Sequence, residues 1–216
     1  MARIAEDLLL LLLDNATAQP ALDRRRRERV LAAGVLLDLA YCCRVRPAVP
    51  GDGAEPGRLI ALRADGPADA VLEPVYQLLL TQPLAPARAI AKIGGDVQAN
   101  VAGHLERLGQ IRRVKTGRKL YAWPLTNRDR AAAARTDLLS ALFDGRPPTP
   151  TTAAIVTVLH AADGLGALLS LNERGWRWVH ARATEIASGS WVDEYPTALA
   201  EVNLAVTASA LRSALA

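Results

Sequence analysis

The sequence comprises 216 residues, which is long enough for one large domain or two small ones with a substantial hydrophobic core. Half of the residues are hydrophobic and only 4% are aromatic, and this Ala-, Leu- and Val-rich composition favours helices over strands. The net charge of +4 and the isoelectric point near 9.4 indicate an anionic partner, either lipid or nucleic acid. The only two cysteines, Cys42 and Cys43, are adjacent and cannot readily bridge each other, which excludes a disulfide framework and is typical of a reducing compartment.

Six consecutive leucines, Leu8 to Leu13, form a strongly hydrophobic run near the start of the sequence. Two acidic residues, Glu6 and Asp7, precede it where a signal peptide would carry positive charge. The run is also too short to cross a bilayer, and no other segment reaches spanning length. It therefore predicts a buried helix, and any membrane contact is expected to be peripheral.

The segment from Arg24 to Cys43 begins with six charged residues and becomes apolar from Val30 onward, where Asp38 is the only charge. A helix that is apolar nearly all round belongs in the middle of a bundle, with its basic first turns in solvent. Arginines at a helix N-terminus oppose the helix dipole, so this cluster is either a solvated cap or serves another purpose. Burial would raise the pKa of Asp38 unless an arginine pairs with it, and a structural ion pair is the expected outcome.

The middle of the chain starts with a loop over Arg46 to Gly57, which is rich in Pro, Gly and Asp. The following run, RLIALRADG, predicts a short strand that pairs with CRVRP. Helical patterns then cover residues 67–81, 85–93 and 96–108. Asp96 is the expected N-cap of the last of these helices, and Gly109 is its expected stop.

A β-hairpin is predicted next, within LGQIRRVKTGRKLYAWPL, Leu108 to Leu125, around the turn KTGR. Cations for anionic headgroups and amphipathic rings for the water–acyl boundary are the features of an interfacial membrane binder. With about 1 kcal/mol for each cation, reduced by salt, and ~1.5 kcal/mol for one ring, the hairpin alone is a weak anchor. Alternatively, its apolar residues pack back on the bundle. The cations are Arg112, Arg113, Lys115, Arg118 and Lys119, and the neighbouring apolar residues are Leu120, Tyr121 and Trp123.

The remainder of the chain predicts helices over residues 127–143, from Thr152, over 176–187 and over 196–215. No repeat or low-complexity linker divides the sequence. We therefore expect a mainly α fold, in which residues 1–216 form a single compact helical domain with a projecting β-hairpin.

Catalytic and cofactor-binding patterns are weak throughout the chain. The three histidines, His104, His160 and His180, lie far apart and lack metal-ligand spacing, and His160 is expected to be a hydrogen-bonded core residue. There is no glycine loop of the kind that holds a nucleotide phosphate and no nucleophile elbow. The sequence predicts no enzyme, no metal and no cofactor.

Residues 85–125 also support a rival interpretation, because they predict a helix, a turn, a helix and a hairpin. This order resembles the winged-helix domains of bacterial transcription regulators. In that interpretation the helix from Asp96 to His104 would read DNA. It offers Gln98 and Asn100 but neither Lys nor Arg, so the wing would have to make nearly all phosphate contacts.

Four motifs in register resemble the Golgi phosphoprotein 3-like family: AEDLLLLLLD, LAAGVLLDLAYCCRV, VAGHLERLGQIRR and TAAIVTVLHAADGL. The likeness runs from about Ala5 to Trp191, and the composition is similar to the bacterial, actinobacterial branch of that family. The winged-helix likeness covers only the middle of the chain and therefore ranks second.

The resemblance implies a helical domain that lies on membranes, recognises phosphatidylinositol 4-phosphate, inserts a hairpin into the bilayer and grips cytoplasmic tails of membrane proteins as an adaptor. The places of the family's pocket tryptophan and three arginines fall at Asp23, Ala32, Gly95 and Gln98, so none is retained. The looser expectation is a peripheral protein at the inner face of the membrane that binds anionic lipid, with hairpin-mediated self-association as a further alternative. The candidate headgroup residues are Arg24, Arg25, Arg27, Arg112, Arg113, Lys115, Arg118 and Lys119, and the candidate insertion residues are Leu120, Tyr121 and Trp123.

Overall fold

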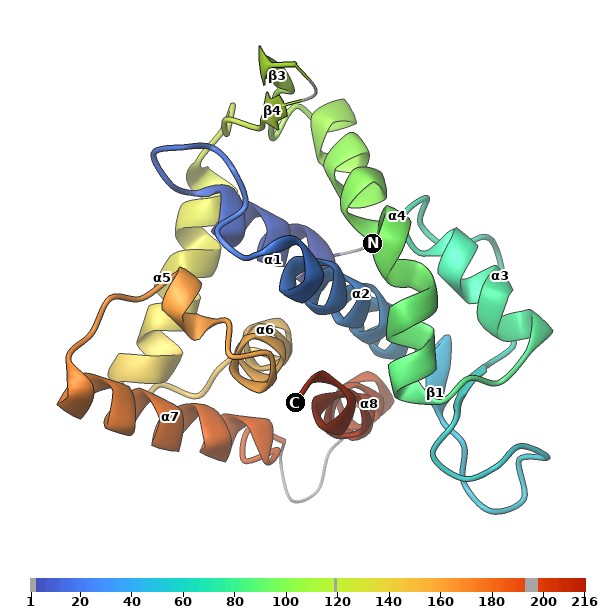
Figure 1. Cartoon of the computed structure of the whole chain (residues 1–216). Helices are drawn as coiled ribbons and strands as arrows, with labels where there is room; N and C mark the ends of the chain where they lie inside the picture. Colours follow the sequence, from blue (N-terminus) through green and yellow to red (C-terminus); the bar gives the residue numbers. More distant parts are fainter. Residues whose placement is uncertain (1–2, 119, 193–197) are drawn as a thin grey trace.

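The computed structural model describes residues 3–118, 120–192 and 198–216, and it is a mainly helical bundle, as the sequence predicted, with two small two-stranded sheets (Figure 1). In chain order the described elements are α1 (Ile4–Leu13), α2 (Arg24–Tyr41), β1 (Val45–Pro47), β2 (Leu59–Ala61), α3 (Glu73–Thr81), α4 (Pro86–Arg107), β3 (Val114–Gly117), β4 (Leu120–Ala122), α5 (Asp129–Phe143), α6 (Pro150–Ala161), the 3-10 turn η1 (Leu165–Ala167), α7 (Glu173–Ala187) and α8 (Leu199–Leu215).

Helix α2 is the central element of the bundle. It packs against α1, α4, α6 and α8, and every residue from Val30 to Ala40 is buried. The leucine run of α1 is buried as predicted, with Leu8 and its neighbours at most 1% exposed. The two helices approach closely at Gly34, where an added Cβ would lie 2.9 Å from Leu8 Cδ1 and 3.0 Å from Ala5 Cα. A glycine is therefore required at this crossing.

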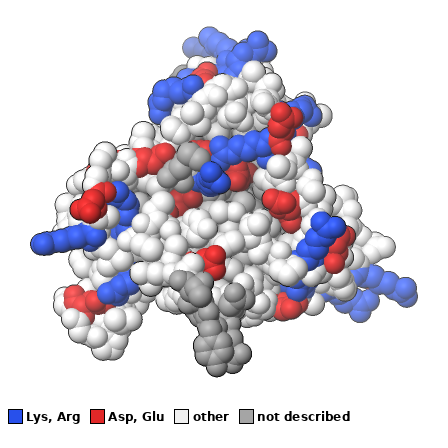
Figure 2. Space-filling view, turned by 180° about the vertical axis from the view of Figure 1, so that it is seen from behind, with Lys and Arg blue, Asp and Glu red and all other residues white. Residues whose placement is uncertain are grey.

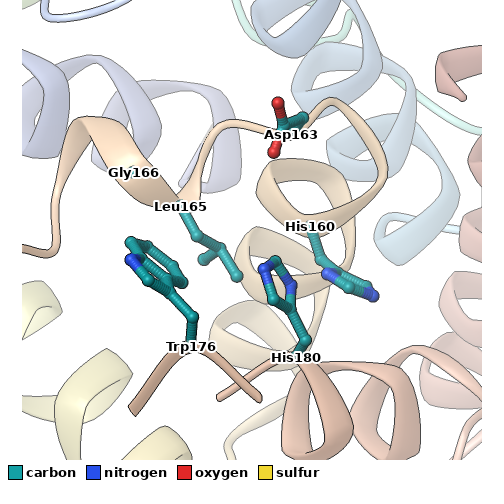
Figure 3. A pocket seen from close by; sticks show the side chains of 6 residues that line it. All are labelled: His160, Asp163, Leu165, Gly166, Trp176 and His180. Carbon is teal, nitrogen blue, oxygen red and sulfur yellow. The ribbon is translucent and has the colours of Figure 1, made fainter. Parts of the chain in front are cut away.

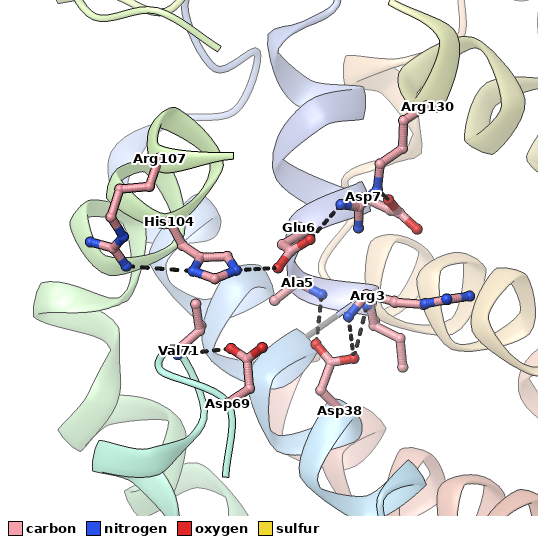
Figure 4. A network of polar contacts seen from close by, with 11 residues as sticks. Arg3, Ala5, Glu6, Asp7, Asp38, Asp69, Val71, His104, Arg107 and Arg130 are labelled. Atoms are coloured by element: carbon pink, nitrogen blue, oxygen red, sulfur yellow. Dashed lines mark hydrogen bonds and ion pairs between the residues drawn. The ribbon is translucent and has the colours of Figure 1, made fainter. Parts of the chain in front are cut away.

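Asp38 on α2 caps the first turn of α1. Its carboxylate accepts hydrogen bonds from the backbone N–H groups of Arg3, Ile4 and Ala5 at 2.9–3.0 Å (Figure 4). These donors have no partner within their own helix, so a buried carboxylate satisfies them and complements the helix dipole. Burial raises the pKa of Asp38 from 3.8 to about 7, although the three hydrogen bonds oppose this shift. The predicted ion pair with an arginine is wrong, because backbone groups take that place.

A second buried carboxylate, Glu6, joins α1 to α4 and α5. Figure 4 shows it between Arg130 of α5 and His104 of α4, whose Nε2 lies 3.4 Å from Glu6 Oε1. Arg130 also donates to Asp7 Oδ1 at 2.6 Å. Burial raises the pKa of Glu6, and Arg130 opposes the shift by hydrogen bonding and by its charge. This network ties three helices together near the start of α1.

The predicted helix–turn–helix is wrong, because helix α4 runs without a break through this region. The two helices expected over residues 85–93 and 96–108 are one helix, and Asp96 lies inside it rather than at an N-cap. Gly94 is buried against Glu28 of α2, and a Cβ added at Gly94 would lie 3.6 Å from the Cβ of Glu28. Packing between the two helices therefore outweighs the weak helix propensity of the glycine pair. The end of the helix is as predicted, because Gly109 follows it with a φ of +67°.

The two hairpins also follow the sequence pattern. Strands β1 and β2 are antiparallel, with Arg46 opposite Ile60, which confirms the expected pairing. Strands β3 and β4 pair antiparallel at the far end of α4, with Lys115 opposite Tyr121 and an irregularity before Gly117 (Figure 1). Across the described residues, no helix is both long enough and apolar enough to cross a membrane.

Candidate functional site

A cavity of about 280 Å³ lies where the start of α2, the second half of α4 and the β3–β4 hairpin meet. Its walls come from segments that are distant in the sequence, because α4 packs along α2. The hairpin follows α4 directly and completes the wall. The lining residues are Arg24, Glu28, Gly95, Gln98, Ala99, Ala102, Gly103, Glu106, Arg113 and Trp123.

The floor of the cavity is a row of small residues on α4. Gly95, Ala99, Ala102 and Gly103 are spaced at i, i+4, i+7 and i+8, so they share one face of the helix. An added Cβ at Gly95 or Gly103 would meet no atom within 4 Å. The hollow therefore exists because this face of α4 carries almost no side-chain volume.

Two arginines line the cavity, Arg24 from the start of α2 and Arg113 from the base of the hairpin. Arg24 Nε donates to Glu28 Oε1 at 2.7 Å, while its side chain stays 80% exposed. The Arg113 guanidinium lies 3.8 Å from the centroid of the Tyr121 ring. Its backbone N–H donates to Glu106 Oε1 at 3.2 Å. Both cations are thus positioned by neighbours and remain open to solvent.

Arg27 lies behind the wall of the cavity. Its Nε donates to Gln98 Oε1 at 2.6 Å and its Nη1 donates to the carbonyl of Leu22 at 2.7 Å. Burial lowers the pKa of Arg27, although nearby carboxylates oppose that shift. Arg27 therefore orients Gln98. The run of arginines is compatible with a helix start because the Asp23 carboxylate caps α2 by accepting from the Arg26 N–H at 3.0 Å.

The other predicted headgroup residues lie around the cavity rather than in its wall. Arg25 on α2 and Arg112, Lys115 and Arg118 on the hairpin are exposed, and Lys119 lies outside the described residues. Figure 2 shows Lys and Arg side chains gathered at the end of the molecule that carries the hairpin, with fewer acidic side chains between them.

The three predicted insertion residues differ in their surroundings. Leu120 is 61% exposed near the hairpin turn. Tyr121 is half-buried beneath Arg113. Trp123 packs against the hydrophobic core and lines the cavity, and its backbone N–H donates to the carbonyl of Ala18 at 2.7 Å. The alternative that Leu120 and Trp123 pack back on the bundle is therefore correct for Trp123 and wrong for Leu120.

Sequence reasoning missed the two carboxylates of the cavity, Glu28 and Glu106, and the small-residue floor. The repeated Gly and Ala on one face of a single long helix is the signal that could have revealed the floor. A predicted turn at Gly94 and Gly95 hid that periodicity. Gly95 and Gln98, to which the resemblance in sequence assigns two pocket positions, both line the cavity, although neither carries a cation.

A second cavity, of about 260 Å³, brings together two histidines that are distant in the sequence. Figure 3 shows His180 of α7 between Trp176 of α7 and His160 of α6. The two imidazole centroids are 5.5 Å apart. His160 Nε2 lies 3.1 Å from Thr184 Oγ1, so the predicted hydrogen bond is present, but His160 is only half-buried. The lining residues include neither Lys nor Arg, which makes this cavity a poor phosphate site. In the described ranges, no three His, Cys, Asp or Glu side chains are grouped to hold a metal ion.

The family model described as Golgi phosphoprotein 3 (GPP34) matches residues 4–202, which is most of the chain. The chain belongs to the Golgi phosphoprotein 3 (GPP34) family. No curated protein matches the sequence.

Proposed function

We propose that this chain is a peripheral membrane protein that binds a phospholipid headgroup in the cavity between α2, α4 and the hairpin. The observation that carries the proposal is that Arg24 and Arg113 both line a cavity whose floor consists of small residues, at the base of a projecting basic hairpin. Membership of the family supports it, and the resemblance in sequence assigns two of the family's pocket positions to Gly95 and Gln98, which line this cavity.

The chemistry of the wall suits a phosphate group. Guanidinium groups donate charge-assisted hydrogen bonds to phosphate oxygens, and Arg24 and Arg113 can contact a ligand because both line the cavity and are exposed. Gln98 adds a neutral donor. Because its Oε1 accepts from Arg27, its NH₂ group remains for a phosphate oxygen.

The hairpin would meet the bilayer at the same time. Leu120 would enter the acyl boundary, with Tyr121 beside it at headgroup depth, while Arg112, Lys115 and Arg118 would lie against anionic lipid. Each such cation contributes about 1 kcal/mol near an anionic surface. Surface charge alone therefore gives a weak anchor, and the cavity supplies the specific contact that the hairpin lacks.

Such a protein would act by binding rather than by catalysis. We place it at the cytoplasmic face of a membrane, where the part of the bundle opposite the hairpin, including α7, would face away from the bilayer (Figure 1). An adaptor that holds cytoplasmic tails of membrane proteins fits this orientation. Self-association through the hairpin would be visible as a change in molar mass by light scattering.

Co-sedimentation with liposomes of increasing phosphatidylglycerol content tests the proposal. The double variant Arg24→Gln/Arg113→Gln removes two cations from the cavity, and we expect its affinity to fall about 30-fold, since each contributes about 1 kcal/mol. The variant Arg174→Gln/Arg177→Gln removes the same charge from exposed positions on α7 and should bind as the wild type does. Equal losses in both variants, or no dependence on anionic lipid, would refute the proposal.

The rival function, DNA binding, loses its geometric basis with the helix–turn–helix. Helix α4 is continuous over Pro86–Arg107, so the helix–turn–helix predicted within residues 85–125 is not present there. Retention of a mixed-sequence duplex at physiological salt would restore that interpretation, whereas binding lost at moderate salt would indicate only non-specific attraction to phosphates.

A further inference from the structure

We propose that the cavity selects phospholipid headgroups that carry an ammonium group next to the phosphate, such as ethanolamine or serine, over headgroups that carry negative charge alone. This inference rests on the proposed function and adds the chemical class of the headgroup. It starts from the two carboxylates in the wall, which a receptor for a purely anionic group would not need.

Glu28 and Glu106 line the same cavity as the two arginines but come from different helices, α2 and α4. Glu28 binds Arg24 through Oε1, and its side chain is 24% exposed. Glu106 is exposed and accepts only the backbone N–H of Arg113 among the described residues. Each carboxylate therefore keeps an oxygen available, and Glu106 forms no ion pair with any side chain that the structure describes.

The charges of the wall decide between headgroup classes. Two arginines and two glutamates leave the lining formally neutral. A headgroup with several negative charges would gain from the arginines but would be repelled by the glutamates. A headgroup with one phosphodiester and one ammonium group can pair with both kinds of side chain, so a neutral lining suits it best.

The arrangement of these charges also fits a zwitterion. Arg24 lies beside Glu28 through their ion pair, and Arg113 lies beside Glu106 through the backbone hydrogen bond. Each side of the cavity therefore presents one cation and one anion. A phosphate can lie between the two guanidinium groups while an ammonium group reaches the carboxylates.

Trp123 supplies a third contact for a cation. Its ring forms part of the wall, and the face of an indole attracts ammonium groups. The size of the cavity agrees with a small headgroup, because its volume of about 280 Å³ lies just below the range of about 300–1,000 Å³ that is typical of pockets for drug-sized ligands. It suits a small headgroup better than a phosphorylated sugar ring.

The test uses liposomes of constant phosphatidylglycerol content, in which phosphatidylcholine is replaced stepwise by phosphatidylethanolamine. We expect the wild type to bind the ethanolamine-containing liposomes several-fold more tightly, because choline cannot donate hydrogen bonds from nitrogen to a carboxylate. At equal surface charge, liposomes that contain phosphatidylserine should also bind the protein more tightly than liposomes that contain phosphatidylglycerol.

Glu106→Gln is the diagnostic variant, because it removes a charge while the side chain can still accept the Arg113 N–H. We expect it to lose the preference for ethanolamine and to bind phosphatidylglycerol more tightly than the wild type does, because one carboxylate that repels an anionic headgroup is gone. Glu173→Gln, an exposed carboxylate at the start of α7, is the matched control and should keep the preference.

The outcomes separate this inference from the proposed function. Wild-type binding to phosphatidylglycerol without any gain from ethanolamine, or a gain that Glu106→Gln retains, overturns the inference alone. Failure to bind any liposome overturns the proposed function. Glycerophosphoethanolamine serves as a soluble arm: its competition with liposomes supports the headgroup assignment, whereas its tight binding by a protein that ignores liposomes overturns the lipid as the source.

Discussion

The guanidinium of Arg113 lies over the ring of Tyr121, 3.8 Å from its centroid. Because Arg113 immediately precedes β3 and Tyr121 lies in β4, this contact joins the two arms of the hairpin. The aromatic ring holds the cation where it lines the cavity, and the cation covers one face of the ring. Tyr121 therefore acts on the site through Arg113, as well as through any contact of its own with a bilayer.

Replacement of Tyr121 by Ser should weaken liposome binding by about 2- to 5-fold, since a cation–π contact at an exposed site contributes about 0.5–1 kcal/mol. Loss of the ring from the bilayer interface would add to this effect. Tyr121→Phe keeps the ring and should bind nearly as the wild type does. Unchanged co-sedimentation of Tyr121→Ser would show that the contact does not position Arg113.

Leu120 is the most exposed apolar side chain of the described hairpin residues, and we expect Leu120→Ser to lower affinity for anionic liposomes by about tenfold. The reason is the loss of ~1.5 kcal/mol from a leucine that enters the acyl region. Leu199, which is 74% exposed on α8, offers a matched control. If Leu199→Ser and Leu120→Ser reduce binding equally, insertion of the hairpin is disproved.

The bundle was largely predictable because its signals are local and strong. The leucine run of α1 and the apolar stretch of α2 are stable only when they are removed from water, and both are buried. The continuity of α4 was not predictable from propensity, because two adjacent glycines favour a break, whereas in the fold Gly94 is buried inside the helix and lies against Glu28. Tertiary contact outweighed the local preference for a turn.

The candidate site was predictable only in part for a similar reason. Cations beside aromatic residues stand out in a sequence, which is why Arg24 and Arg113 were candidates. A carboxylate such as Glu106 resembles any solvated residue of a helix until the fold places it beside the hairpin. Asp38 shows the same limit, since its partners are backbone groups that no pattern of side chains reveals.

Stability should fall as the pH rises from about 4 to about 7, because the folded protein binds a proton on Asp38 more tightly than the unfolded chain does. The pKa of Asp38 is about 7 when folded against 3.8 ordinarily, a difference that corresponds to on the order of 4 kcal/mol. The contribution is fully lost above the folded pKa. Glu6 adds to the same trend, since burial raises its pKa too.

Urea unfolding at a series of pH values measures this dependence. The Asp38→Asn variant cannot ionise at this position, so its stability should change less with pH than that of the wild type. Parallel curves for the two proteins would contradict the assignment of the proton to Asp38.

Removal of Arg130 should destabilise the fold by about 3–5 kcal/mol, because Glu6 would remain as a buried charge without its cation. Glu6 is 1% exposed, and Arg130 is its arginine partner among the described residues. Arg135→Ala provides the comparison: its partner Asp14 is 20% exposed, so the loss should be about 1 kcal/mol. Chemical denaturation measures the free energy of unfolding of Arg130→Ala and of Arg135→Ala. Equal losses of stability in the two variants would argue against a special role of the buried pair. Addition of Glu6→Gln to Arg130→Ala should restore part of the lost stability.

Two glycine substitutions should have opposite effects on stability, because one glycine lies in a tight crossing and the other lies over open space. Gly34→Ala should cost about 1–3 kcal/mol, since the new Cβ would lie 2.9 Å from Leu8 Cδ1 and 3.0 Å from the backbone of Ala5. Gly103→Ala should stabilise α4 by about 0.5–1 kcal/mol, because nothing lies within 4 Å of its new Cβ.

The same Gly103→Ala substitution separates stability from binding. Its methyl group would occupy part of the cavity floor, so we expect a higher melting temperature together with weaker binding to liposomes. A surface-only interaction through the hairpin would leave binding unchanged, because Gly103 lies on α4 and not on the strands. Thermal unfolding and co-sedimentation of this one variant therefore decide whether the lipid enters the cavity or only touches the hairpin.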